Sequence, residues 1–171
     1  TYGSSGTGTA LHLAGEVFAS VAGVKLQHVP YKTAAQSMTD LLGGQVKAMF
    51  DSPNNSSPQI KNGKLKGLAI MGPERISVLS DVPTTTELGM PAMRFTNWLG
   101  VYAPAGTPPA IVERLIRILR PTMNDEDMKE YFERSGMPPS ALFGQELAAA
   151  SRTQRSELAD VIKRANIALL D

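Results

Sequence analysis

The chain has 171 residues, enough for one ordinary domain or parts of two, and 42% of them are hydrophobic. Seventeen basic and sixteen acidic residues give a formal net charge of +1, which argues against nucleic acid as a partner. The absence of cysteine excludes disulfides, cysteine–zinc sites and thiol catalysis. The sequence shows no apolar run of membrane-helix length and no signal peptide.

A glycine–serine loop at residues 2–8 opens the chain and leads directly into a predicted helix. Apolar residues at helical spacing predict this helix over residues 9–22, and Gly23 is its expected C-cap. Glycines let a backbone approach a ligand closely, and helix N-termini attract negative charge. The loop and helix therefore predict a site for a small anion. Because almost no strand precedes the loop, we expect the chain to lack an N-terminal part of its protein.

Short apolar runs alternate with helical patterns over the first hundred residues, which is typical of an α/β fold with a parallel sheet. The predicted strands are residues 24–29, 46–50 and 65–71. The predicted helices between them are residues 34–42 and 58–62, the second beginning at a Ser57–Pro58 pair that fits an N-cap and N1 proline.

The pattern changes near residues 97–104. An apolar, aromatic run predicts a strand over residues 95–103, and a proline-rich turn follows it. Beyond the turn, the predicted helices are residues 110–123, 126–135 and 144–170, with a short strand at 137–142. The boundary divides the chain into an α/β part, residues 1–97, and a mainly helical part, residues 98–171.

The opening loop does not match the motifs of catalysis or nucleotide binding. The hydrolase nucleophile elbow, Gly-x-Ser-x-Gly, fails around both Ser4 and Ser5, and neither the Walker loop nor the dinucleotide fingerprint fits. No cofactor is therefore predicted. His12 and His28 stand apart without a ligand cluster, so no metal site is predicted. Two alternatives stay open: a tight turn without a ligand, and an α/β enzyme that uses the loop as an anion or oxyanion site.

Two other polar loops follow predicted strands. Tyr31 lies in the loop after the strand predicted at residues 24–29, and Asp51 follows the strand predicted at residues 46–50. Ligands of open parallel sheets bind outside the carboxyl ends of the strands, so both loops should share one rim with the opening loop. Each residue also has a purely structural interpretation, Tyr31 as part of a turn and Asp51 as an Asx-turn residue.

These motifs, in this order and spacing, resemble the tripartite tricarboxylate transporter substrate-binding receptors, also called Bug proteins. The segments that carry the resemblance are residues 2–8, 28–32, 41–46, 49–52, 63–69, 81–84, 87–89 and 103–108. The resemblance covers nearly the whole chain. No single motif is decisive, but together they are quite specific.

The resemblance implies a periplasmic-binding-protein-like α/β fold with two domains around a cleft. Residues 1–97 would form most of the second domain, and residues 98–171 would cross back to complete the first, whose N-terminal segment is missing here. The implied function is a periplasmic, non-enzymatic receptor that captures a small organic acid and delivers it to a membrane permease. A sensing module that serves a regulator would keep the same site. The acid itself is left open.

The matching loops also imply which residues bind the ligand. The residues implied are Ser4, Ser5, Gly6, Thr7, Tyr31, Thr33, Ala34 and Asp51. The opening loop at residues 2–8 would bind a carboxylate, in agreement with the anion argument, and Asp51 would meet a distal polar group. The family usually has glycine–serine where this chain has Thr33–Ala34, and the larger side chain would narrow the cleft or change the ligand.

Overall fold

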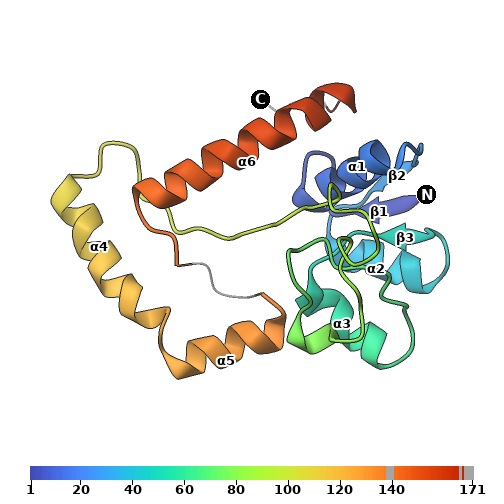
Figure 1. Cartoon of the computed structure of the whole chain (residues 1–171), viewed down its shortest axis with the longest axis horizontal. Coiled ribbons are helices and arrows are strands. Elements are labelled where there is room, and N and C mark those ends of the chain that lie inside the picture. Colours follow the sequence, from blue (N-terminus) through green and yellow to red (C-terminus); the bar gives the residue numbers. More distant parts are fainter. Residues whose placement is uncertain (138–140, 166, 168–171) are drawn as a thin grey trace.

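The computed structural model describes residues 1–137, 141–165 and 167, and its centre is a small parallel sheet. Strands β1 (Tyr2–Ser4), β2 (His28–Pro30) and β3 (Ala48–Met49) pair in the order β2-β1-β3 (Figure 1). Both neighbours run parallel to β1. The α/β fold expected from the sequence is therefore present.

Helices cover both faces of this sheet. Helix α1 (Ala10–Ala22) connects β1 to β2, and helix α2 (Ala34–Leu42) connects β2 back across β1 to β3. Because parallel crossovers are right-handed, connections that run in opposite directions place their helices on opposite faces. The direction of winding reverses at β1, which makes the carboxyl edge beside this strand the expected ligand position of the fold.

Two glycines let the layers approach one another. A Cβ on Gly15 of α1 would lie 2.3 Å from the ring of Tyr2, whose side chain is fully buried. On the other face, a Cβ on Gly3 would lie 2.1 Å from the hydroxyl of Ser37 in α2. The successive residues Tyr2 and Gly3 thus face different helices, as the pleat of a strand requires.

Helix α3 (Pro53–Lys61) begins earlier than the sequence pattern predicted. Its N-cap is Ser52 with Pro53 in the first turn, whereas Pro58, the predicted first residue, lies inside the helix. The chain offers two serine–proline pairs, and the first one begins three residues after the end of β3. The Ser52 carbonyl accepts hydrogen bonds from the amides of Asn55 (3.0 Å) and Ser56 (3.2 Å), which closes the first turn there.

Two predicted strands, residues 65–71 and 95–103, are not formed. In the first, Ile70 makes only an isolated bridge to Thr84, and the second is extended without a ladder partner. An apolar run becomes a strand only when another strand offers its backbone groups. Side chains of the second run are largely exposed, with Leu99 at 88%. The predicted strand at 137–142 falls partly on 138–140, outside the described residues.

The second half of the chain is mainly helical and open. After the 3₁₀ turn η1 (Ser77–Leu79) come α4 (Pro109–Thr122), α5 (Glu126–Ser135) and α6 (Gln145–Arg164). Helix α6 packs on α1, and α5 packs on η1 and α3, whereas α4 lies away from the sheet (Figure 1). The end of the helix predicted over residues 144–170 lies mostly outside the described residues.

Helix α4 is amphipathic but buries none of its residues. Ile111, Leu115 and Ile118 share one of its faces and are exposed. Arg120, near its end, lies 4.5 Å over the ring of Phe143. Among the described residues, no helix combines the length and apolar character that crossing a bilayer requires.

Candidate functional site

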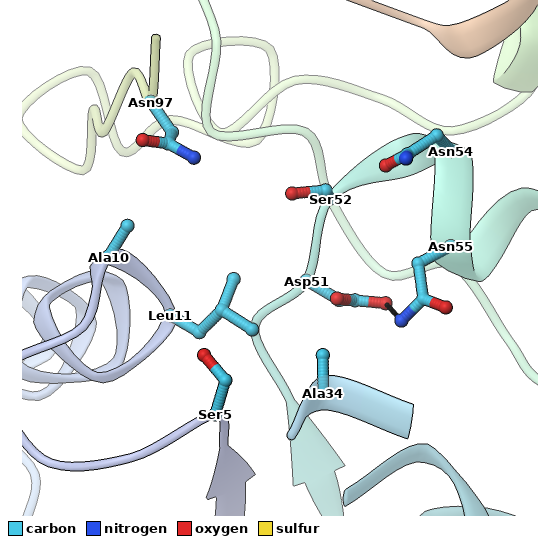
Figure 2. A pocket seen from close by; sticks show the side chains of 9 residues that line it. All are labelled: Ser5, Ala10, Leu11, Ala34, Asp51, Ser52, Asn54, Asn55 and Asn97. Carbon is cyan, nitrogen blue, oxygen red and sulfur yellow. Dashed lines mark hydrogen bonds between the residues drawn. The ribbon is translucent and has the colours of Figure 1, made fainter. Parts of the chain in front are cut away.

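An open hollow of about 400 Å³ lies at the carboxyl edge of the sheet. Its lining residues are Ser5, Ala10, Leu11, Ala34, Asp51, Ser52, Asn54, Asn55 and Asn97. Figure 2 shows these side chains around the hollow, with Ser5 above the end of β1 and Asn97 on the opposite side. The hollow therefore lies where the winding of the sheet reverses.

The N-termini of three helices meet at this hollow. Ala10 begins α1, Ala34 begins α2, and Asn54 lies in the first turn of α3, and all three residues line it. The first amides of an α-helix have no partner within the helix, and each helix start carries a partial positive charge. The three helix starts together make this edge of the sheet favourable for an anion.

The loop after β1 brings one serine to the hollow and buries the other. Ser5 lines the hollow, whereas Ser4 is 0% exposed. The Ser4 hydroxyl accepts a hydrogen bond from the Gly6 amide at 3.1 Å and lies 2.6 Å from Nε2 of His28. Gly6 (φ 125°) and Gly8 (φ 78°) adopt backbone conformations that favour glycine. The glycines thus turn the chain from the buried strand to the start of α1.

Two stacked histidines, His12 and His28, contact this loop. The rings of His12 and His28 are 3.9 Å apart between centroids with 15° between their planes. The amide of Gly8 donates a hydrogen bond to Nδ1 of His12 at 3.0 Å. His12 therefore contacts the loop's backbone through a ring nitrogen, while His28 contacts it through Ser4.

Glu16 and Tyr2 complete the cluster below the loop. The Tyr2 hydroxyl donates to Oε1 of Glu16 at 2.7 Å, and the same oxygen lies 3.7 Å from Nε2 of His12. Burial lowers the pKa of His12, and the Glu16 carboxylate opposes that effect. Burial also lowers the pKa of His28, helped by His12. Both rings are therefore neutral at physiological pH.

Asp51 places a carboxyl group in the hollow, two residues after the end of β3. Its Oδ2 accepts a hydrogen bond from Nδ2 of Asn55 at 2.8 Å. Burial raises the pKa of Asp51 to about 6, although hydrogen bonds from the Ser52 backbone and the Asn55 side chain oppose the shift. Asp51 can thus accept hydrogen bonds at neutral pH and can also carry a proton in mildly acidic solution.

The predicted site residues occupy different positions around the hollow. Ser5, Ala34 and Asp51 line it. Tyr31 lies outside its lining, and its hydroxyl donates to Oδ2 of Asp40 at 2.7 Å. Thr33 caps α2 by accepting a hydrogen bond from the Gln36 amide. Gly6 and Thr7 also lie outside the lining, in the turn of the loop, with Thr7 exposed. Their role in binding stays a prediction.

The sequence interpretation missed several polar residues of the hollow. Ser52, Asn54 and Asn55 form the start of α3 and would have been found if the first serine–proline pair had been taken as the helix start. Asn97 lies far away in the sequence and reaches the hollow because the extended segment passes over it (Figure 2). Its only signal is a polar amide within an apolar run. Within the described residues, no group of three metal-binding side chains is close enough to hold an ion.

Comparison with known proteins identifies the family. Residues 1–167 match the model described as tripartite tricarboxylate transporter family receptor. A UPF0065 protein in the gbd 5' region of Cupriavidus necator is 37% identical over 164 residues, 95% of this chain and 50% of the relative.

Two solved structures are also similar to this chain. The periplasmic binding protein BugD is 33% identical with a TM-score of 0.84, over 97% of this chain and 56% of that one. R. palustris Rpa4515 with adipate is 31% identical with a TM-score of 0.84, over 99% of this chain and 56% of that one. The fold is thus that of periplasmic binding proteins, and the chain spans about half the length of these relatives. The chain belongs to the tripartite tricarboxylate transporter receptor family.

Proposed function

We propose that the chain is part of a solute receptor that captures a small carboxylate in a cleft, and that this part binds the carboxylate group. The observation that carries this proposal is the meeting of three helix N-termini at one hollow beside β1. Preorganised amides and partial positive charges suit an ionised carboxylate, because hydrogen bonds to a charged acceptor are about twice as strong as neutral ones. Ser5 supplies a hydroxyl at the same edge.

Asp51 supports a hydrogen-bond donor at the other end of the ligand. A carboxylate of the ligand belongs near Ser5 and the helix starts, whereas the Asp51 side chain favours a hydrogen-bond donor. A second carboxylate close to ionised Asp51 would be repelled unless one of them held a proton. We therefore propose acids with a hydroxyl, an amine or a protonated carboxyl opposite the bound carboxylate. The adipate in the Rpa4515 structure supports a dicarboxylate as the first class to test.

The exposed apolar surfaces support a two-domain arrangement. Residues 98–171 would complete a first domain whose remaining part comes from a segment of the same protein outside this chain. Helix α4 exposes Leu115 and Ile118 on its apolar face, and the extended segment exposes Leu99 and Tyr102. Exposed apolar surface of this kind marks an interaction site. The solved relatives are long enough to contain such a further segment, since this chain covers 56% of each of them.

The family also indicates a partner and a compartment for the proposed receptor. We propose that the receptor works in the periplasm and hands its ligand to a membrane permease of the tripartite tricarboxylate type. Membership of a transporter receptor family supports this proposal. Closure of two domains around the hollow would bury the ligand and create the surface that the permease recognises.

An enzymatic role is less well supported. The Ser4 hydroxyl and His28 Nε2 are 2.6 Å apart, which is the distance expected of a nucleophile and its base. However, Ser4 is 0% exposed, so a substrate carbonyl would not reach its oxygen. Ser5, the serine that lines the hollow, is a different residue, and the Nδ1 of His12 accepts a hydrogen bond from the Gly8 amide. We therefore propose that the function is binding rather than catalysis.

A thermal-shift screen tests the proposal. The complete receptor, with the segment outside this chain, is screened against malate, succinate, adipate, citrate and benzoate. A ligand at 100 times its dissociation constant adds about 2.7 kcal/mol of stability. We expect one acid to raise the melting temperature, and Ser5→Ala and Asp51→Ala to reduce this shift. Lys64→Ala, on the exposed loop after α3, is the matched control. A folded protein that responds to none of the acids would contradict the receptor function.

A further inference from the structure

A pair of stacked histidines, His12 and His28, contacts the loop of the hollow and lies outside the lining. We propose that His12 is a positioning residue: its neutral Nδ1 holds the Gly8 amide and thereby fixes the loop at residues 5–8, and protonation of this ring releases the loop. The geometry that carries the proposal is the 3.0 Å hydrogen bond from the Gly8 amide to Nδ1. That the loop binds a ligand rests on the proposed receptor function.

The hydrogen bond defines the tautomer of His12. Because the Gly8 amide donates to Nδ1, this nitrogen carries no proton, and the neutral ring holds its proton on Nε2. The Nε2 proton then faces Oε1 of Glu16, 3.7 Å away. A protonated ring would carry a hydrogen on both nitrogens, so a donor at Nδ1 would oppose the donor of Gly8. Protonation and the loop contact therefore exclude each other.

Hydrogen bonds from Ser4 and Thr9 hold the loop at Gly6, and the bond to His12 holds it at Gly8. Gly8 is exposed with a φ of 78°, and the Thr9 hydroxyl donates to the Gly6 carbonyl at 2.7 Å. The start of α1, where Ala10 lines the hollow, follows immediately. Release of the Gly8 amide would let the segment between Gly6 and α1 change its turn. The amides aimed at a bound carboxylate would then lose their fixed directions.

Three titratable groups of the described residues face the His12 ring. Glu16 belongs to the same helix, Tyr2 comes from β1 with ring centroids 6.5 Å apart, and His28 comes from β2 in a face-to-face stack. Glu16 favours the protonated ring, whereas burial and a charge on His28 disfavour it. Burial dominates, so the pKa of His12 lies below its ordinary value of 6.5. The loop should therefore be held at neutral pH and released in acid.

Two substitutions of His12 distinguish the effect of its hydrogen-bond acceptor from the effect of its ring. His12→Asn places an amide oxygen close to the position of Nδ1 and does not titrate, so it keeps the acceptor. His12→Phe keeps a flat ring for the stack on His28 and removes the acceptor. Solvent exchange of the Gly8 amide is measured by NMR in the complete receptor without ligand, at about pH 7.5 and about pH 5. Imidazole ¹⁵N spectra of the unsubstituted protein report which ring nitrogen carries the proton.

The expected result is specific for the acceptor. The Gly8 amide of the unsubstituted protein is protected near neutral pH and exchanges about fivefold faster, relative to an unstructured amide, in acid, as expected for loss of one neutral hydrogen bond. His12→Asn is protected at both pH values, and His12→Phe at neither. Protection retained in His12→Phe would overturn the proposal. If that variant does not fold, a proton found on Nδ1 of His12 at neutral pH would overturn it instead.

Ligand binding provides a separate readout. We expect His12→Phe to bind succinate about fivefold to tenfold more weakly near neutral pH, and His12→Asn to bind it with little dependence on pH. The amide measurement decides the positioning role without any ligand. If the amide behaves as expected and neither succinate nor another acid binds the unsubstituted protein, the receptor function is wrong and the positioning role stands. If succinate binds all three proteins equally, the loop that His12 fixes does not serve ligand binding, and that part of the proposal is wrong.

Discussion

The ring of Tyr2 packs directly on the backbone of Gly15, and a Cβ at Gly15 would lie 2.3 Å from Cε2 of that ring. Gly15→Ala must therefore displace a fully buried side chain. We expect overpacking to cost roughly 1–3 kcal/mol, partly offset by the better helix propensity of alanine.

The comparison variant is Gly43→Ala, where the nearest atom to the added Cβ is a carbonyl oxygen at 3.4 Å. Urea unfolding of both variants measures the difference. Equal stability of the two variants would show that the contact between Tyr2 and Gly15 is looser than the structure indicates.

The two serines of the opening loop should respond differently to substitution by alanine. Ser4 is buried and hydrogen-bonded to the Gly6 amide and to His28, so Ser4→Ala should destabilise the protein by about 1–3 kcal/mol. Ser5 lines the hollow, so Ser5→Ala should leave stability within about 0.5 kcal/mol and weaken carboxylate binding. Chemical unfolding and calorimetric titration separate the two effects, and the reverse pattern would contradict the assignment.

The Asp51 carboxyl group makes stability depend on pH in a defined direction. Its pKa rises from 3.8 to about 6 on folding, so the folded state binds the proton more tightly than the unfolded state. The contribution of Asp51 to stability therefore falls as the pH rises from 3.8 to about 6.

Asp51→Asn removes this charge and should stabilise the protein by about 1–2 kcal/mol at neutral pH, after allowing for partial exposure. The gain should shrink towards the acidic end of this pH range. Unfolding curves at neutral pH and at the acidic end of this range test this prediction. A stabilisation by Asp51→Asn that did not depend on pH would argue against burial as the cause.

Glu87 should show the opposite pH dependence. Hydrogen bonds from Arg75 and from the Thr84 backbone lower its pKa from 4.5 to about 2. Its contribution to stability is therefore complete above pH 4.5 and is lost as the pH falls towards 2. Glu87→Gln should lack this acid-dependent loss, and salt should weaken the contribution because both side chains are exposed. A melting-temperature profile against pH, identical for the variant and the parent, would contradict the role of Glu87.

The exposed face of α4 distinguishes this chain alone from the complete receptor. Leu115→Gln should change the stability of the 171-residue chain by less than about 0.5 kcal/mol, because the side chain is already 43% exposed. The same substitution should destabilise the complete receptor by roughly 1–3 kcal/mol if another segment covers the helix. Arg117→Gln on the same helix, also exposed, is the control. An equally small effect in both proteins would contradict the two-domain arrangement.

Local sequence patterns were sufficient for the helices beside the sheet. The prediction over residues 34–42 has the bounds of α2, and the prediction over 9–22 differs from α1 by one residue. Apolar periodicity and glycine stops are local signals, so they need no knowledge of the fold. The strands were harder to predict, because β3 keeps only Ala48–Met49 of a longer apolar run. Pairing partners, not composition, determine how much of such a run becomes strand.

The same distinction applies to the hollow. Ser5 directly follows β1 and Asp51 lies two residues beyond β3, so the rule for carboxyl ends of parallel strands was enough to bring them together. Asn97 is brought there by the path of a long extended segment, which no local pattern encodes. The buried histidine contacts were equally hidden, since the sequence shows two isolated imidazoles and only the packing of β2 on α1 stacks them.

The single tryptophan of the chain gives the hollow a built-in optical reporter. Trp98 follows Asn97, and its indole N–H donates to Oε1 of Gln154 in α6 at 2.6 Å. Intrinsic tryptophan emission therefore comes from one point, beside the hollow and attached to the helix that packs on α1. A ligand that draws this segment inward would change the surroundings of that indole. Unlabelled protein in a fluorimeter would then report the filling of the hollow in real time.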